Sequence, residues 1–178
     1  MRKTALAVLA FVLLAGSAAS AAAPEPTKPV DLDRFMGRWY EILRTPNSNQ
    51  KNCGAAYQDW SRRPPDKFAI AQNCRKPDGS WRRVGTSAKV IDPATNAKFE
   101  ASFFGGLIKG RYWVVDHGGD YSWMIATTED GKCPALLARS PSITVGETAR
   151  LKSRMAALGF DTGKLRSYGS AEGLARAD

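Results

Sequence analysis

The sequence predicts an all-β domain: an eight-stranded up-and-down antiparallel β-barrel with one C-terminal α-helix packed outside it. Three observations predict this fold class. The chain has 178 residues, 43% of them hydrophobic, which suits one globular domain. Short segments rich in aromatic and β-branched residues follow one another, separated by turn residues at intervals of about ten residues. Only one later segment has the period of an amphipathic helix.

Turns rich in glycine, proline and asparagine separate the predicted strands. The first strand ends at Pro46-Asn47, and the third ends before Pro77-Asp78-Gly79. Eight strands in meander order are about the number that closes a barrel around one small ligand. The predicted strands cover residues 38–44, 53–60, 67–74, 80–91, 97–104, 110–116, 121–127 and 133–139.

A single helix is predicted after the strands. Thr144, with Glu147 three residues later, forms a capping box. Leu151, Met155 and Leu158 then form one apolar stripe, and a glycine follows where a helix commonly ends. A helix with one apolar face must lie outside the barrel.

The N-terminal residues predict export. Arg2 and Lys3 precede an apolar stretch that is too short for a membrane span, and an Ala-x-Ala cleavage site ends at Ala21. We expect residues 1–21 to be a signal peptide, with a retained anchor helix as the alternative. Residues 14–17 resemble a bacterial lipobox in which Ser17 replaces the acylated cysteine. The expected location is therefore the periplasm, either free or associated with the outer membrane.

The expected organisation of the rest of the chain is simple. Residues 22–31 are expected to form a flexible Pro-rich tail, residues 32–168 the barrel and its helix, and residues 169–178 a disordered tail.

Two of the cysteines are predicted to form a disulfide. If the second and third strands pair through the RRPPD turn with Trp60 opposite Lys67, Cys53 lies opposite Cys74. An exported protein meets an oxidising compartment, where such a pair forms a bond. Two buried thiols are the alternative, and Cys133 is expected to stay free.

The charge pattern excludes several classes of function. Lys and Arg number 26 against 17 acidic residues, a net charge of +9, but the cations occur only singly and in pairs. Nucleic-acid binding is therefore not expected, while peripheral contact with an anionic membrane surface stays open. The one histidine, His117, excludes zinc sites built on several histidines, and its glycine-rich turn predicts a solvated side chain.

Three segments carry a family resemblance. Residues 37–42 (GRWYEI) contain a G-x-W sequence, residues 112–126 span the sixth and seventh strands, and residues 137–143 contain an arginine at the end of the eighth. In this order they resemble the three lipocalin motifs. Residues 102–112 (SFFGGLIKGRY) also resemble a sequence of bacterial outer-membrane lipocalins, kin to apolipoprotein D.

The resemblance implies a structural plug at the closed end of the barrel. It places Trp39 there, with the Arg139 guanidinium across the indole, a cation–π contact of about 0.5–2 kcal/mol. Because side chains alternate along a strand, this anchor predicts which residues face the interior. The predicted inward residues are Glu41, Leu43, Ala55, Tyr57, Asp59, Phe68, Ile70, Gln72, Phe99, Ala101, Phe103, Trp113, Val115, Met124, Ala126, Ala135 and Leu137.

The predicted interior is apolar with small residues interspersed, which leaves room for a small hydrophobic molecule. A filled core without a ligand is the alternative. All the inward residues except Asp59, Phe68, Ala126 and Ala135 are predicted to contact the ligand. The Glu41 and Asp59 carboxylates are expected to accept hydrogen bonds from Tyr57, Gln72 or a ligand head group rather than to catalyse a reaction.

The resemblance implies a carrier of a fatty acid or lysophospholipid that stores or transports lipid for membrane maintenance. No enzyme activity, cofactor or metal is expected, and a monomer and a homodimer both stay open. The alternatives are a tetrapyrrole carrier and an isomerase or redox enzyme that uses Cys133, whose thiol pKa the adjacent Lys132 would lower.

The open mouth is predicted at the loops 46–52, 75–79, 105–109 and 129–132. Cations near these loops either form a rim suited to a phosphate or serve solubility. They are Arg44, Lys51, Arg75, Lys76, Lys109 and Lys132.

Overall fold

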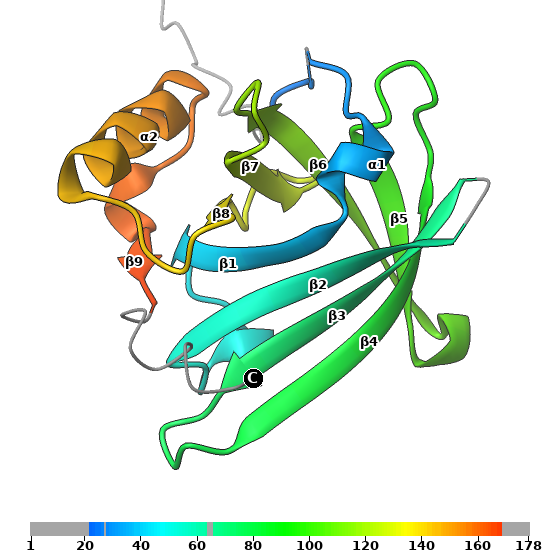
Figure 1. The fold of residues 1–178 in the computed structure, drawn as a ribbon, viewed down its shortest axis with the longest axis horizontal. Coiled ribbons are helices and arrows are strands. Elements are labelled where there is room, and N and C mark those ends of the chain that lie inside the picture. The colour runs from blue at the N-terminus through cyan, green and yellow to red at the C-terminus, as the bar shows by residue number, and fades with distance from the viewer. Residues whose placement is uncertain (1–21, 27, 64–65, 169–178) are drawn as a thin grey trace, which may run out of the picture.

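The computed structural model describes residues 22–26, 28–63 and 66–168, which form a closed β-barrel (Figure 1). The expected signal peptide, residues 1–21, and the expected C-terminal tail, residues 169–178, lie outside the described residues. Within the described part of the chain, no helix has both the length and the apolar character needed to cross a bilayer.

Eight strands close the barrel in meander order, and a ninth short strand lies beside the first. Each strand pairs antiparallel with the next, and β1 closes the barrel by pairing with both β2 and β8. The predicted fold class is confirmed, with β9 as an addition. The strands are β1 (Gly37–Arg44), β2 (Ala55–Arg63), β3 (Lys67–Arg75), β4 (Trp81–Val90), β5 (Lys98–Phe103), β6 (Ile108–His117), β7 (Trp123–Thr128), β8 (Ala135–Ala138) and β9 (Arg166–Ser167).

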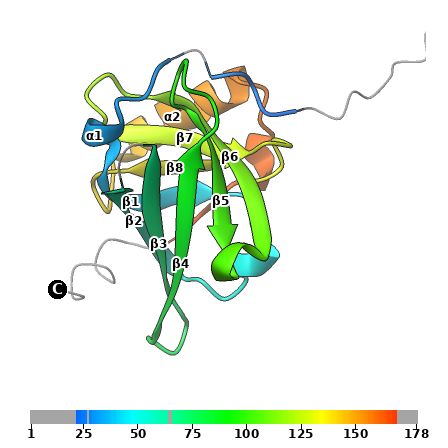
Figure 2. The same ribbon diagram turned by 90° about the vertical axis from the view of Figure 1, so that its right-hand side faces the viewer.

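A short helix, α1 (Leu32–Phe35), lies across one end of the barrel (Figure 2). The Asp31 carboxylate caps it by accepting hydrogen bonds from two backbone N–H groups of its first turn. The helix buries Phe35, whose ring centre lies 5.1 Å from that of Trp39 and 5.2 Å from that of Trp60. Aromatic side chains therefore fill this end, which we call the closed end.

The predicted helix is α2 (Val145–Ala157), and it packs outside the barrel (Figure 1). The Thr144 hydroxyl accepts a hydrogen bond of 3.1 Å from the Glu147 N–H, as the capping box predicts. Leu151 and Met155 are fully buried. They belong to a cluster on the outer face of the barrel that includes Trp113, Val115, Trp123, Ile125 and Leu136.

The predicted disulfide is present, but the register that predicted it is wrong. Cys53 and Cys74 are bonded, with their Cα atoms 5.3 Å apart, and Cys133 is free. However, Ala56 lies opposite Cys74, because β2 continues to Arg63 and pairs this residue with Lys67, where the predicted register paired Trp60 with it. Cys53 therefore lies just before β2 and reaches Cys74 from the preceding loop.

Three further short helices complete the described chain. The first, η1 (Ser48–Gln50), follows β1, and the second, η2 (Phe104–Gly106), forms the turn between β5 and β6. A third, η3 (Thr162–Lys164), links α2 to β9.

Candidate functional site

The barrel interior collects most of the predicted inward residues. Phe68, Ile70, Phe99, Ala101, Met124 and Leu137 are buried in one cluster, with Phe103, Ala126 and Ala135 packed against it. Trp60 and Ala88 belong to the same cluster, although the sequence did not predict them there. Aromatic side chains therefore line the closed half of the interior, with alanines at several of the remaining wall positions.

Six of the predicted inward residues lie on other faces. Leu43, Trp113 and Val115 belong to the outer cluster beneath α2. Ala55 and Tyr57 pack in a separate cluster beside Tyr40. Asp59 forms an ion pair of 2.8 Å with Arg38, and the hydrogen bond that Arg38 donates to it raises the Arg38 pKa.

Each of these errors has a local cause. The β2–β3 register differs by an odd number of residues from the predicted one, which reverses the facing of β2 and places Gln58 opposite Gln72. A bulge in β1 between Glu41 and Leu43 turns the latter outward. On β6 both faces are buried, so the apolar run 113–115 has no polar alternation to reveal its facing.

The closed end holds the stacked pair that the resemblance implied. The Arg139 guanidinium carbon lies 3.8 Å from the centre of the Trp39 ring. Arg139 also donates hydrogen bonds of 2.9–3.0 Å to the backbone carbonyls of Arg34, Phe35 and Arg38. The Trp39 indole N–H donates to the Phe35 carbonyl at 2.9 Å. One arginine thus ties α1 to β1 across the end of the barrel.

A buried carboxylate, Glu41, lies away from the closed end and is contacted by Arg44 and Gln50. It accepts a charge-assisted hydrogen bond of 2.6 Å from Arg44, which is 2% exposed. Its other hydrogen bonds come from the side-chain amides of Gln50, Gln58 and Gln72, at 2.9–3.2 Å. We call these five residues the Glu41 cluster. It satisfies the buried charge, as a charge in a protein interior requires.

Sequence reasoning placed only part of this cluster. Gln72 was predicted as a partner of Glu41, whereas Arg44 was expected at the exposed rim and is buried instead. Gln50 and Gln58 were missed. The facing of Gln58 depends on the β2 register, and Gln50 reaches the interior from a loop, where strand periodicity gives no signal.

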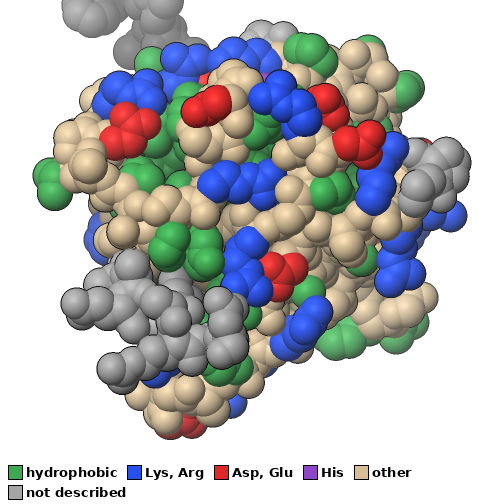
Figure 3. All heavy atoms as spheres, in the orientation of Figure 1, with side chains coloured by type: hydrophobic (Ala, Val, Ile, Leu, Met, Phe, Trp, Pro, Cys, Tyr) green, Lys and Arg blue, Asp and Glu red, His purple; other side chains and the backbone are tan. Residues whose placement is uncertain are grey.

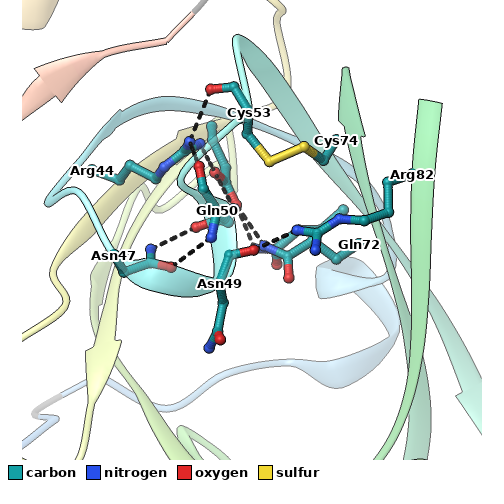
Figure 4. Close-up of a disulfide and its surroundings, with 10 residues drawn as sticks. Arg44, Asn47, Asn49, Gln50, Cys53, Gln72, Cys74 and Arg82 are labelled. Atoms are coloured by element: carbon teal, nitrogen blue, oxygen red, sulfur yellow. Dashed lines mark hydrogen bonds and ion pairs between the residues drawn. A yellow bond between two sulfur atoms is a disulfide. The ribbon is translucent and has the colours of Figure 1, made fainter. Parts of the chain in front are cut away.

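The loop between β1 and β2 covers the Glu41 cluster (Figure 4). Within it, Asn47 caps η1 and bonds the Gln50 side chain at 2.8 Å. Arg44 donates to the Gln50 and Cys53 carbonyls, at 3.4 and 3.2 Å. The disulfide fastens the loop to β3, and Arg82 donates a hydrogen bond to the Asn49 carbonyl. Residues 45–54 therefore form a tethered lid over one end of the interior.

A groove of about 850 Å³ lies at the side of the barrel, between β4 and η2. Pairing between β4 and β5 begins at Ser87, opposite Ser102, while β4 itself begins at Trp81. The groove is lined by outer-face residues of β2, β3 and β4, by Phe104, Gly105 and Gly106 of η2, and by Ile70 and Thr86. Ile70 belongs to the interior cluster, and Thr86 lies opposite it on β4. The groove therefore brings the outer surface next to interior residues.

His117 is buried and not solvated as the sequence predicted. It is 5% exposed, and its ring stacks on that of Tyr121 with the ring centres 4.6 Å apart. Its Nδ1 lies 2.8 Å from the Gly118 carbonyl oxygen and its Nε2 lies 3.2 Å from the Pro29 carbonyl oxygen. These contacts place it at the closed end, where the N-terminal segment packs. The imidazole therefore serves to hold backbone segments together.

Cys133 lies next to Tyr112. Burial of Tyr112 raises the pKa of its hydroxyl, and the nearby Cys133 raises it further. His117 is at the closed end, so it is not placed as a base for this thiol. Within the described residues, acidic, cysteine and histidine side chains form no group that could hold a metal ion.

Comparisons with known proteins agree with this geometry. The family model of the lipocalin-like domain matches residues 30–169. The outer membrane lipoprotein Blc of Vibrio cholerae is 23% identical over 160 residues, which cover 89% of this chain and 93% of that protein. Apolipoprotein D of Rattus norvegicus is 32% identical over 95 residues, which cover 51% of this chain and 49% of that protein.

Solved structures show the same fold. Insecticyanin from Manduca sexta aligns with a TM-score of 0.68 at 16% identity, over 84% of this chain and 87% of that one. Lobster apocrustacyanin A1 aligns with a TM-score of 0.62 at 13% identity, over 84% and 92%. The family model, the ordered motifs and the closed eight-stranded barrel agree, and the chain belongs to the lipocalin family.

Proposed function

We propose that this lipocalin binds and carries a lipid with an acyl chain, a fatty acid or a lysophospholipid, in the barrel interior. The observation that carries the proposal is the lining of the interior. Apolar walls with alanines at positions 88, 101, 126 and 135 lead from the aromatic closed end toward the polar Glu41 cluster. An apolar pocket with a few convergent polar groups is the usual form of a small-molecule site.

Burial of the chain supplies the affinity. Each buried methylene contributes about 0.8 kcal/mol, so several methylenes offset the ordering of the ligand and reach roughly micromolar affinity. The polar end of the ligand would remain near the Glu41 cluster and the exposed side chains of Lys51, Lys76, Lys109 and Lys132. Gln58 and Gln72 are only half-buried, so their amides are the groups best placed to meet a head group.

The relatives support the assignment of a carrier. Two of them are named as an outer membrane lipoprotein and an apolipoprotein. We infer a periplasmic protein that stores or transports lipid for membrane maintenance, with or without association with the outer membrane. Enzyme catalysis through Cys133 has less support, because the one histidine is packed at the closed end. Its two ring nitrogens face backbone carbonyls, which also disfavours axial ligation of a tetrapyrrole.

The test is a fluorescence titration of lipid-free protein with a lysophospholipid. Trp60 lies in the interior cluster, stacked on Phe68, whereas Trp113 lies outside beneath α2. We expect a saturable change at roughly micromolar lipid, retained in Trp113→Phe and strongly reduced in Trp60→Phe. A signal that depends on Trp113 and not on Trp60 would contradict an interior site.

Two neighbouring substitutions separate the interior from the side groove. Ala101→Arg places a cation at an interior position that is 2% exposed, whereas Ser87→Arg fills the groove from an exposed position on the outer face. We expect Ala101→Arg to abolish binding and Ser87→Arg to retain it, with circular dichroism confirming the fold. Ala101→Phe, which fills the interior without a charge, is the second blocking variant. Wild-type affinity in folded Ala101→Phe would overturn the proposal.

A further inference from the structure

The tip of the β5–β6 hairpin exposes large hydrophobic side chains. Phe104 is 69% exposed, Leu107 88% and Ile108 56%. Among the described residues these are three of the six large hydrophobic side chains that are exposed, and they follow one another closely in the chain. We call Phe104, Leu107 and Ile108 the apolar tip. Contiguous exposed apolar residues mark an interaction site more often than scattered ones do.

One residue of the apolar tip, Phe104, has an unfavourable backbone conformation. Phe104 has φ of 50°, in the left-handed region that a residue with a bulky side chain rarely adopts. Gly105 and Gly106 follow with φ of 68° and 100°. Strained backbone of this kind clusters at ligand-binding and switch sites.

The surface beside the apolar tip is cationic. Lys109 forms an ion pair of 3.2 Å with Glu100, and Lys89 and Arg111 also lie near this carboxylate. Arg111 also pairs with Glu129 at 3.1 Å, so three cations here face two carboxylates, and the local balance is positive. In Figure 3, hydrophobic side chains lie at the lower right edge, where Figure 1 places η2, with Lys and Arg side chains nearby.

The position of the apolar tip links it to the barrel interior. Phe103, the last residue of β5, packs against the interior cluster, while the adjacent Phe104 points into solvent and lines the side groove. A surface that covers the tip would therefore lie against the side of the barrel where the groove meets interior residues.

We propose that the apolar tip docks this protein on a bilayer that contains anionic phospholipids. Phe104, Leu107 and Ile108 enter the boundary between head groups and acyl chains, while Lys109 and Arg111 lie beside lipid phosphates. A second copy of this chain fits less well, because it would bring two cationic surfaces together, and three side chains are far fewer than the roughly 20–30 residues a side of a stable interface. The proposal rests on the proposed function, in that the docked barrel exchanges its ligand with the bilayer.

The experiment is co-sedimentation of the purified protein with phosphatidylcholine vesicles, with and without phosphatidylglycerol. The test variant is Leu107→Asp, and the matched control is Val145→Asp, since Val145 is also 88% exposed but lies at the start of α2. We expect binding to the anionic vesicles that weakens with added salt. Leu107→Asp should lower the partition coefficient at least about tenfold, because in the docked protein a charge would replace the leucine that enters the bilayer. Val145→Asp should leave the coefficient unchanged.

Any one of the following results in the vesicle and oligomeric-state measurements would overturn the docking proposal. The wild-type protein stays in the supernatant with anionic vesicles. The partition coefficient falls equally in Leu107→Asp and Val145→Asp. The wild-type protein is a dimer, and Leu107→Asp converts it to a monomer. Titration of lysophospholipid below its micelle concentration separates docking from ligand carriage. Leu107→Asp should keep wild-type affinity there, so a failure to dock leaves the carrier proposal standing. If Leu107→Asp loses soluble-ligand binding as well, the tip belongs to the ligand site and the docking proposal is wrong.

Discussion

Glu41 and Arg44 form a buried ion pair inside an otherwise largely apolar barrel, with side chains that are each 3% exposed. Removing two charges from water is costly, and only their mutual attraction and the surrounding amides offset that cost. The pair also connects β1 to the lid through the hydrogen bonds of Gln50 and the Cys53 carbonyl. Its energetic role therefore depends on both partners being present.

Removing one charge of this pair should destabilise the fold strongly. Glu41→Leu leaves the Arg44 guanidinium buried without its anion, and we expect a loss of about 3–5 kcal/mol in the free energy of unfolding, measured in urea. The double variant Glu41→Leu/Arg44→Met should recover much of that loss, because it removes both charges. Glu147→Gln, in an exposed pair on α2, is the control and should change little. A single variant as stable as the wild type would show that the pair is not buried in solution.

For single residues, the sequence is informative where one face of a strand is polar. Alternation correctly places Phe68, Ile70 and Gln72 on β3, because polar or small residues separate them. It places Trp113 wrongly, because α2 buries the other face of β6 as well. When both faces of a strand are buried, both carry apolar residues, so the alternation of polar and apolar residues no longer shows which face points into the barrel.

Among the structural elements, the N-terminal segment is tied to both the barrel and α2. Asp116, at the end of β6, pairs with Lys28 at 2.8 Å and with Arg154 of α2. Burial acts to raise the pKa of Asp116, but the hydrogen bonds from Arg154 and Lys28 outweigh it and hold the pKa below its ordinary value. One carboxylate therefore joins three segments that are distant in the sequence.

This arrangement predicts a specific acid dependence of stability. A carboxylate whose pKa is lowered by folding stabilises the native state above its unfolded pKa of about 3.9 and loses that contribution as the pH falls through the folded value. Asp116→Asn should be less stable than the wild type at pH 7, and the difference should shrink below about pH 4. Urea unfolding at several pH values measures this. Asp33→Asn, at an exposed carboxylate, is the control, and a difference independent of pH would contradict the prediction.

Element boundaries follow from turn chemistry, but short elements do not. The strands and α2 were predicted because each has several periods of its pattern. α1 has four residues, too few to show a helical period, and its one sequence signal is Asp31 as a capping residue. The lid depends on tertiary contacts of Gln50 and Asn49, which no local pattern encodes. The cysteines indicated its tether, although the predicted register was wrong.

For the whole molecule, closure of the barrel could be predicted because it depends on strand number and order. Eight meander strands leave β1 and β8 as free edges, and pairing them satisfies both rows of backbone groups. It is harder to predict which side chains face the interior, because a bulge or a register shift of one residue reverses the facing of a strand. The fold therefore follows from the sequence more surely than the ligand contacts do.

A ligand that binds only the closed barrel must stabilise the whole fold. At a free lysophospholipid concentration of about one hundred times the dissociation constant, the free energy of unfolding should rise by about 2.7 kcal/mol. For a chain of this size that corresponds to a rise of roughly 5–10 °C in the melting temperature, measured by calorimetry on protein freed of lipid. Folded Ala101→Phe should show no rise at the same concentration, because its interior is filled. If the wild-type melting temperature stayed constant while Trp60 fluorescence saturated, the lipid would bind the unfolded chain equally well, and the barrel interior would not be its site.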